Sequence, residues 1–181
     1  MRSFTSCSIS ALIFAAAFAV PLSAQEGTPK FLEEFELQFE ASARKFVALA
    51  EAMPESAYEW RPGEGVSSVA EVYMHVATYN HMYPHENLGL TGPVPESEYS
   101  RWEDDISGKA EVLEILTASM QYVRDVTEGM KSGPVDGPTR LYGRTVGEWA
   151  VLFQLVTHMN EHLGQSIAYA RMNDVVPPWS R

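Results

Sequence analysis

The sequence predicts an all-α protein, a four-helix bundle preceded by a cleavable signal peptide. Four segments carry apolar residues at spacings of three and four, the period of an amphipathic helix, and connections rich in proline and glycine separate them. The first 24 residues differ from the rest, with a long apolar run and a single charge. No segment predicts a strand. We therefore divide the chain of 181 residues into a signal peptide, 1–24, and one bundle domain, 25–181.

The N-terminal segment is typical of an export signal. Arg2 gives it a short positive start, and residues 9–20 form an apolar run that only Ser10 interrupts. Small residues lead up to Ala24, after which we expect cleavage. The run is too short for a permanent membrane span, so we expect a secreted or periplasmic protein with no stable membrane insertion after cleavage. Leu22 suits the −3 position of a cleavage site poorly, which leaves a retained anchor as the alternative.

Composition narrows the chemistry of the mature chain. Cys7 is the single cysteine and lies before the apolar run, which argues against a lipoprotein and leaves the mature chain without a thiol or disulfide. Loss of Arg2 with the signal changes the formal net charge from −11 to −12. Such an acidic chain without a basic run is expected to repel nucleic acid and anionic lipid. Chemistry must then come from histidines, carboxylates, hydroxyls, a metal or a bound cofactor.

The first helix is predicted over residues 28–53. Thr28 and Pro29 suit an N-cap and a first-turn proline, and Pro54 ends the pattern. An apolar stripe along this helix is expected to face the core and consists of Leu32, Phe35, Phe39, Phe46 and Leu49.

The second helix is predicted to begin at Ser68 and to run to about His85. Ser68 and Glu71 have the spacing of a capping box. The expected buried face follows from the helical period and carries Val72, His75, Tyr79 and Met82. His81 and His85 share a different face, and we expect them to be solvated or at the rim of the bundle. A second metal pair is the less favoured interpretation, because a spacing of four alone is a weak signal.

A long polar connection, 89–108, leads to the third helix, predicted over 109–130. Connections of this length are either functional or held by their own side chains, and Tyr99 and Trp102 are expected to hold this one against the bundle. The acidic run 103–105 is expected to be solvated surface.

The fourth helix is predicted over residues 145–173, with Thr145 and Glu148 as its capping box. One face of this helix is expected to point inward and carries Val151, Leu155, His158, His162, Ser166 and Tyr169. Two imidazoles four residues apart aim at the same point, which is how one helix supplies two ligands to a divalent metal. The motif lacks a glutamate directly after the first histidine, so it differs from the H-E-x-x-H motif of metalloproteases.

His75, His158 and His162 together predict a three-nitrogen metal site. Sites in helical bundles are built from side chains that project inward from facing helices. Three protein ligands with an open fourth position are typical of catalytic zinc, so zinc is our first expectation, with nickel or iron as alternatives. The inward stripes carry no set of carboxylates, which disfavours a di-iron site. The simpler alternative is a group of core histidines that bind no metal.

Two longer patterns bear a family resemblance. WRPGEGVSSVAEVYMHVA, followed downstream by GEWAVLFQLVTHMNEHLGQSIAYARMNDVVPPWS, resembles the DinB-like (YfiT-like) metalloprotein superfamily over roughly residues 31–180. The most specific part is the H-x-x-x-H-x-G-Q block. The resemblance implies a four-helix bundle with zinc or nickel on three histidines, which correspond to His75, His158 and His162. It also implies thiol-dependent S-transferase or isomerase chemistry with bacillithiol, mycothiol or glutathione. The chain departs from such relatives in its export signal, because those thiols are chiefly cytoplasmic.

Gln165 and Tyr79 lie next to the expected ligands on their helices, and we expect them to contact a bound group. Gln165 could orient a coordinated group or a ligand imidazole. The alternative, equally weighted, is an amide that links helix ends.

The sequence therefore favours an exported, metal-dependent transferase or hydrolase that activates a thiol or water for attack on a small-molecule substrate. A non-catalytic metal- or ligand-binding bundle of the cell envelope is the alternative. Because the bundle can bury its own apolar stripes, we expect a monomer or a weak homodimer.

Overall fold

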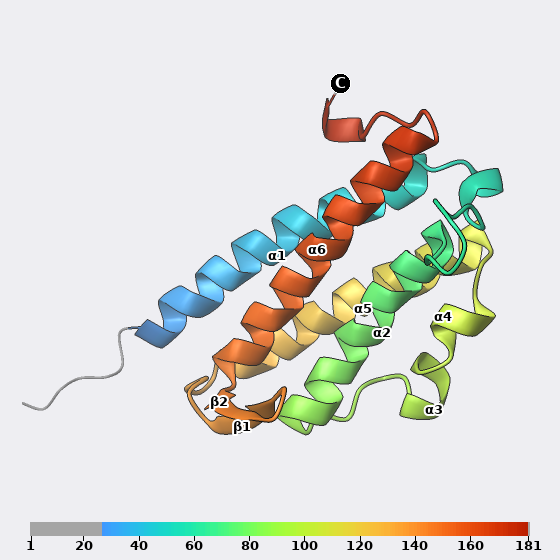
Figure 1. Cartoon of the computed structure of the whole chain (residues 1–181). Coiled ribbons are helices and arrows are strands. Elements are labelled where there is room, and N and C mark those ends of the chain that lie inside the picture. Colours follow the sequence, from blue (N-terminus) through green and yellow to red (C-terminus); the bar gives the residue numbers. More distant parts are fainter. Residues whose placement is uncertain (1–26, 181) are drawn as a thin grey trace, which may run out of the picture.

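Four long helices form the bundle in the computed structural model, which describes residues 27–180. Their bounds are Gly27–Ala52 (α1), Val69–Leu88 (α2), Lys109–Met130 (α5) and Trp149–Met172 (α6). Helix α1 packs on α5 and α6, and α2 packs on the same two helices from the other side (Figure 1). The expected signal peptide lies outside the described residues. None of the helices that the structure describes has both the length and the apolarity needed to cross a bilayer.

The core consists mainly of the stripes that the helical period predicts. Phe35, Phe39, Phe46 and Leu49 of α1 are all buried. The α2 capping box is also confirmed: Glu71 N–H donates to Ser68 Oγ at 3.2 Å, and Ser68 N–H donates to Glu71 Oε2 at 3.0 Å. These contacts fix where α2 begins.

The connection between α2 and α5 is structured by its own aromatic residues, as predicted. It contains two short helices, Glu96–Tyr99 (α3) and Trp102–Asp105 (α4), and α4 packs against α2. Tyr99 and Trp102 are both buried. The connection therefore covers one side of α2, and Figure 1 shows it there in yellow-green.

The prediction that the chain contains no strand is wrong. A hairpin of Pro138–Leu141 (β1) and Arg144–Gly147 (β2) precedes α6. Its two-residue loop, Tyr142 and Gly143, has positive φ angles of 49° and 76°, as a tight turn between twisted strands requires. Strand β1 contacts α2 and β2 contacts α6, so the hairpin bridges these helices at one end of the bundle.

The start predicted for the fourth helix is also wrong. Thr145 lies in β2, where it pairs with Arg140, and α6 begins only at Trp149. The N-cap residue Glu148 makes no side-chain capping bond. The backbone N–H of Glu148 donates to Gly137 O at 3.0 Å, and that of Trp149 donates to Val135 O at 2.8 Å. Pairing with the preceding segment thus replaces the local capping box.

His81 is buried, which corrects the expectation that it is solvated. Only 3% of the residue is exposed, and its ring stacks on Tyr122 with centroids 4.6 Å apart. The correction follows from α2 packing against α4 and α5 as well as α6, so that apolar surroundings cover a second face. Burial lowers the pKa of His81 to about 4, because a charged imidazole loses its hydration there.

We expect His81 to make the fold sensitive to acid. Between pH 6.5 and about 4, the unfolded chain binds a proton at this imidazole that the folded chain does not. The free energy of unfolding should therefore fall as pH falls through this window, by up to about 3 kcal/mol from this group alone. In His81→Phe, which keeps an aromatic ring, that part of the pH dependence should disappear. Urea unfolding followed by circular dichroism at several pH values measures it.

His85→Phe is the matched control, because His85 is exposed on the same helix. It should retain the acid sensitivity of the parent chain. Parallel pH dependences for the parent and His81→Phe would contradict the assignment.

Candidate metal centre

Three histidines meet between α2 and α6. His75 comes from α2, and His158 and His162 come from successive turns of α6. One ring nitrogen from each lies within 4.8 Å of the other two. The predicted convergence is therefore confirmed across a sequence separation of 83 residues between His75 and His158. The cluster could hold a metal ion.

The spacing of the rings fits a metal with nitrogen ligands. His75 Nε2 and His158 Nε2 are 3.1 Å apart, and the ring centroids of the three histidines are 4.6–5.0 Å apart. In a tetrahedral zinc site with bonds of about 2.0–2.1 Å, neighbouring nitrogens are roughly 3.3 Å apart. The closest pair is already near that distance.

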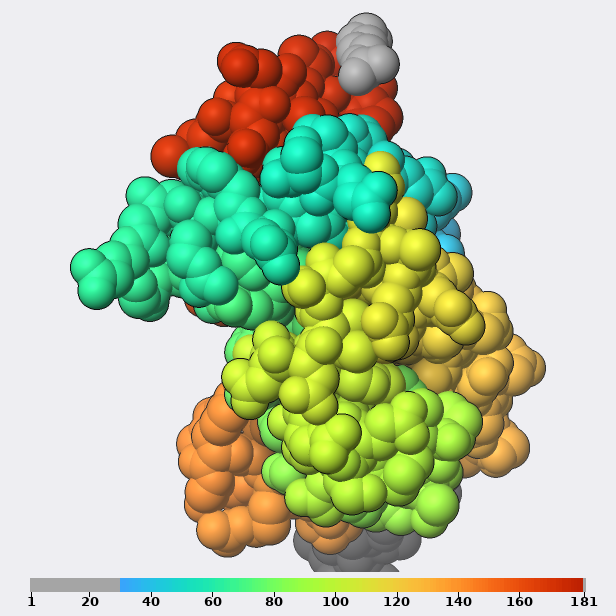
Figure 2. Space-filling model, turned by 90° about the vertical axis from the view of Figure 1, so that its right-hand side faces the viewer, coloured from blue at the N-terminus to red at the C-terminus, as the bar shows by residue number. Residues whose placement is uncertain are grey.

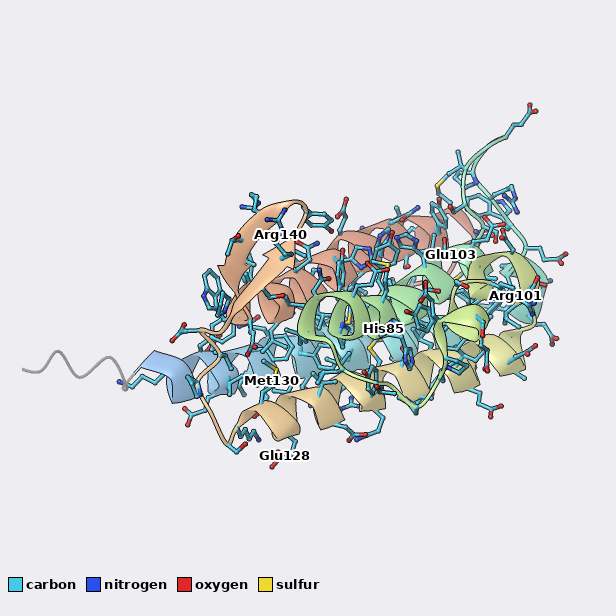
Figure 3. The ribbon with its side chains drawn as sticks, turned by 90° about the horizontal axis from the view of Figure 1, so that it is seen from below. His85, Arg101, Glu103, Glu128, Met130 and Arg140 are labelled. Carbon is cyan, nitrogen blue, oxygen red and sulfur yellow. The ribbon has the colours of Figure 1, made fainter. Side chains whose placement is uncertain are left out.

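A carboxylate orients the ring of His75. Glu103 Oε2 lies 3.0 Å from His75 Nδ1. Because an ionised carboxylate only accepts hydrogen bonds, Nδ1 carries the proton and Nε2 keeps its lone pair toward the other histidines. Glu103 belongs to α4, which the preceding connection places beside α2 (Figure 3). This contact corrects the expectation that the acidic run 103–105 is only solvated surface.

An amide orients the ring of His162. Gln165 Oε1 lies 2.9 Å from His162 Nδ1, so that nitrogen donates and Nε2 is left free to bind. Of the two interpretations of Gln165, the structure supports the one in which the amide orients an imidazole. Carboxylate or carbonyl partners on the far nitrogen are typical of metal-bound histidines.

The electrostatics favour neutral imidazoles. Burial, and after it charge repulsion from the neighbouring rings of His162 and His75, lowers the pKa of His158 to about 3. Burial also lowers the pKa of His162. Both rings therefore stay neutral at physiological pH, which is the form that binds a metal.

Tyrosines line one side of the cluster. The ring of Tyr79 lies 4.4 Å from that of His75 and 4.6 Å from that of His158, between centroids. Within the described part of the chain its hydroxyl makes no hydrogen bond. Burial and then the charge of Glu103 raise the pKa of Tyr79, so the phenol keeps its proton. Tyr79 therefore lies where the sequence places it, beside the ligands.

Two more tyrosines and one amide belong to this wall, and the sequence reasoning missed them. Tyr83 contacts His158 and hydrogen-bonds through its hydroxyl to Tyr142 of the hairpin turn. Gln154 Nε2 donates to Tyr83 Oη at 3.4 Å. A signal existed for Tyr83 and Gln154, because each is four residues from Tyr79 or His158 along its helix. The only local signal for Tyr142 was its position before a glycine.

The surface has a recess over α2, the helix that carries His75. Figure 2 shows this recess between the hairpin (orange) and the segment that follows α1 (teal), with part of α2 (green) inside it. Three carboxylates act electrostatically on titratable groups of the site. Glu103 and Glu161 act on His162, and Glu86 acts on Tyr79. We call these three carboxylates, Glu86, Glu103 and Glu161, the acidic rim.

His81 and His85 do not join the cluster. His85 is exposed, and its Nδ1 lies 2.8 Å from the hydroxyl of Tyr99. His81 faces α4 and α5 instead of α6. Among the described residues, the pair belongs to no group of three metal-binding side chains.

Comparison with known proteins identifies relatives of this chain. A family model described as the DinB superfamily matches residues 38–166, which is 129 of the 181 residues. A search of curated proteins gives no match. Both solved structures reported below are less than 25% identical to the chain, so the structural likeness shows the fold alone.

One similar structure is a DinB-like protein from Bacillus cereus ATCC 10987, with a TM-score of 0.65 and 14% identity over 83% of this chain and 95% of that one. The other is described as a putative member of the DinB family from Exiguobacterium sibiricum 255-15. It has a TM-score of 0.61 and 19% identity, and the match covers 80% of this chain and 92% of that one.

Metal occupancy should depend on His162. His162→Ala leaves two of the three imidazoles, and two neutral ligands hold zinc poorly against buffer competitors. We expect most of the bound metal to be lost while the helical content persists, because the apolar stripes supply most of the burial. Metal per chain by elemental analysis, with circular dichroism, measures both. His85→Ala removes an exposed histidine outside the cluster and should leave metal content unchanged; equal loss in both variants would place the metal elsewhere.

Proposed function

The chain belongs to the DinB superfamily, and from this we propose that it is a divalent-metal-dependent hydrolase or transferase. The observation that carries the proposal is the convergence of His75, His158 and His162, with one ring nitrogen of each within 4.8 Å of the other two. Zinc is the expected ion, and nickel or iron are the alternatives that imidazole ligands also accept. An ion in such a donor set supplies Lewis acidity, which lowers the pKa of water or a thiol toward neutrality.

The side chains around the cluster supply orientation and hydrogen bonds. Glu103 and Gln165 hold the rings of His75 and His162. The free hydroxyl of Tyr79 is placed to donate a hydrogen bond to a polar group of the substrate, since its raised pKa keeps it protonated. Whether the nucleophile is water or a thiol depends on which of them reaches the recess.

The acidic rim favours water or a neutral thiol over a thiol that carries carboxylates. Glu86, Glu103 and Glu161 act on groups of the site, and the whole chain has a formal charge of −11. Like charges in a partly desolvated recess repel an anionic partner. We therefore favour hydrolysis of a neutral or cationic small molecule.

A non-catalytic metal- or ligand-binding protein of the envelope is the second candidate. It is favoured by one observation: Glu103, the carboxylate that contacts the cluster, is already bound to His75 and is not free to act as a general base.

Activity assays with charged and neutral partners test the proposal. Mature chain purified without an affinity tag is analysed for metal, then assayed with a neutral nitrophenyl ester, its carboxylated analogue, 2-mercaptoethanol and glutathione. We expect metal-dependent turnover that prefers the neutral ester. Metal binding without turnover of any partner would favour the non-catalytic candidate, and absence of metal binding would remove both.

Glu161→Gln sharpens the same assay, because Glu161 is exposed on α6 beside His162. At low salt we expect kcat/KM for the carboxylated ester to rise by roughly 2- to 5-fold, with the neutral ester unchanged. Glu128→Gln, which removes an exposed carboxylate of α5, is the control for net charge. A preference for anionic partners in the parent chain would contradict the acidic-rim argument.

We also propose that the protein is exported, on the basis of Arg2 and the apolar run 9–20. The mature chain in the envelope or medium should begin at Gln25, as read by mass spectrometry of its N-terminal peptide. Deletion of residues 9–20 should keep the protein in the cytoplasm. Full-length chain that begins at Met1, found in the cytoplasm, would contradict export.

A further inference from the structure

A chain of hydrogen bonds connects His162 to the beginning of α2. His162 Nδ1 lies 2.9 Å from Gln165 Oε1, and Gln165 Nε2 donates to the hydroxyl of Tyr169 at 2.9 Å. The Tyr169 hydroxyl in turn donates to the backbone carbonyl of Ser67 at 3.1 Å. Ser67 directly precedes Ser68, the N-cap of α2. The chain therefore links the two helices that carry the histidines.

The direction of every bond in this chain is determined by its last member. A backbone carbonyl can only accept, so the single proton of the Tyr169 hydroxyl points to Ser67. Tyr169 can then only accept from Gln165, which must present its NH2 group. The carbonyl end of the same amide consequently faces His162, whose Nδ1 must donate. A free glutamine amide could adopt either orientation, and the network selects one of them.

We infer that Tyr169 is a positioning residue that fixes the tautomer of His162 by holding the orientation of the Gln165 amide. With the amide reversed, its NH2 group would face His162 Nδ1, the ring proton would move to Nε2, and the nitrogen directed at the cluster would lose its lone pair. The inference rests on the proposed metal site for its purpose, but the tautomer itself is a property of the metal-free protein.

Packing keeps the Tyr169 hydroxyl in place. Tyr169 is 6% exposed, and the Trp60 ring meets its ring edge to face with centroids 5.4 Å apart. Trp60 is itself fixed, because Val69 N–H of the first turn of α2 donates to its carbonyl at 3.0 Å. The segment before α2 thus holds both the ring of Tyr169 and the acceptor of its proton.

Tyr169→Phe tests the inference, since it removes the hydroxyl and keeps the ring. In metal-free parent protein, two-dimensional ¹⁵N–¹H spectra of the histidine rings should show His162 with its proton on Nδ1. In Tyr169→Phe the signals should shift toward a mixture of tautomers, and the Kd for zinc should rise about 3- to 10-fold, less than the roughly 10- to 100-fold typical for loss of a direct partner of a ligand histidine. Tyr58→Phe is the matched control, because Tyr58 likewise donates through its hydroxyl to a backbone carbonyl, that of Ala50, away from the cluster.

Gln165→Glu separates positioning from a structural role. A carboxylate has no donor end, so it accepts from His162 Nδ1 in either orientation and no longer needs Tyr169. In this background Tyr169→Phe should change neither the tautomer nor the Kd. An equal effect of Tyr169→Phe in both backgrounds, or an unchanged tautomer in Tyr169→Phe alone, would overturn the inference.

Gln165→Leu covers the case in which Tyr169→Phe does not fold. It removes the amide without altering Tyr169 and should release the tautomer of His162 in the same way; a retained Nδ1 proton there would also overturn the inference. Parent protein that binds no zinc, yet shows the tautomer shift in Tyr169→Phe, would refute the proposed function and leave the positioning role intact.

Discussion

The arrangement of the site depends on the hydrogen bonds that two histidines make through Nδ1, the ring nitrogen that faces away from the cluster. His75 donates to Glu103, and His162 donates to Gln165. A buried imidazole whose far nitrogen had no partner would be free to rotate or to exchange its tautomer, and three such rings would seldom present three lone pairs together. The bundle brings the rings near each other, but these partners decide which nitrogen faces inward. This requirement constrains two segments outside the four long helices. The connection that carries Glu103 must pack against α2, and the segment before α2 must contact α6.

The sequence predicted the parts of this arrangement that a single helix determines. Periodicity and capping within a few residues determine the apolar stripes, the start of α2 and the bounds of α5. Both signals can be recognised within a single segment of the sequence. The same reasoning placed His75, His158 and His162 on inward faces. Their convergence needed only the further assumption that α2 and α6 are neighbours. Gln165 could be predicted from the sequence for the same reason, because it is three residues from His162 on the same helix.

The features that the sequence did not predict are determined by contacts between segments. Thr145 and Glu148 satisfy the spacing rule for a capping box, yet strand pairing of Thr145 with Arg140 competes for the same backbone and prevails. His81 was assigned to the wrong environment because α2 packs against neighbours on several sides, so helical phase alone does not separate buried from exposed faces. Glu103 lies in an acidic run that is indistinguishable from solvated surface until the fold places it 3.0 Å from His75.

The cluster places one buried imidazole, His158, beside two half-buried ones, His75 and His162. Desolvation and repulsion between the rings disfavour the charged forms of His158 and His162, so the folded chain without metal carries polar groups that only partly compensate each other. A cation bound between α2 and α6 would replace that repulsion with attraction and would add a direct link between two helices that are far apart in the sequence. Because an ion that binds only the folded state stabilises it by mass action, metal binding and stability of this pair of helices should be coupled. The acidic rim acts in the same direction, since carboxylates near the recess attract a cation and offset the cost of placing its charge inside the bundle.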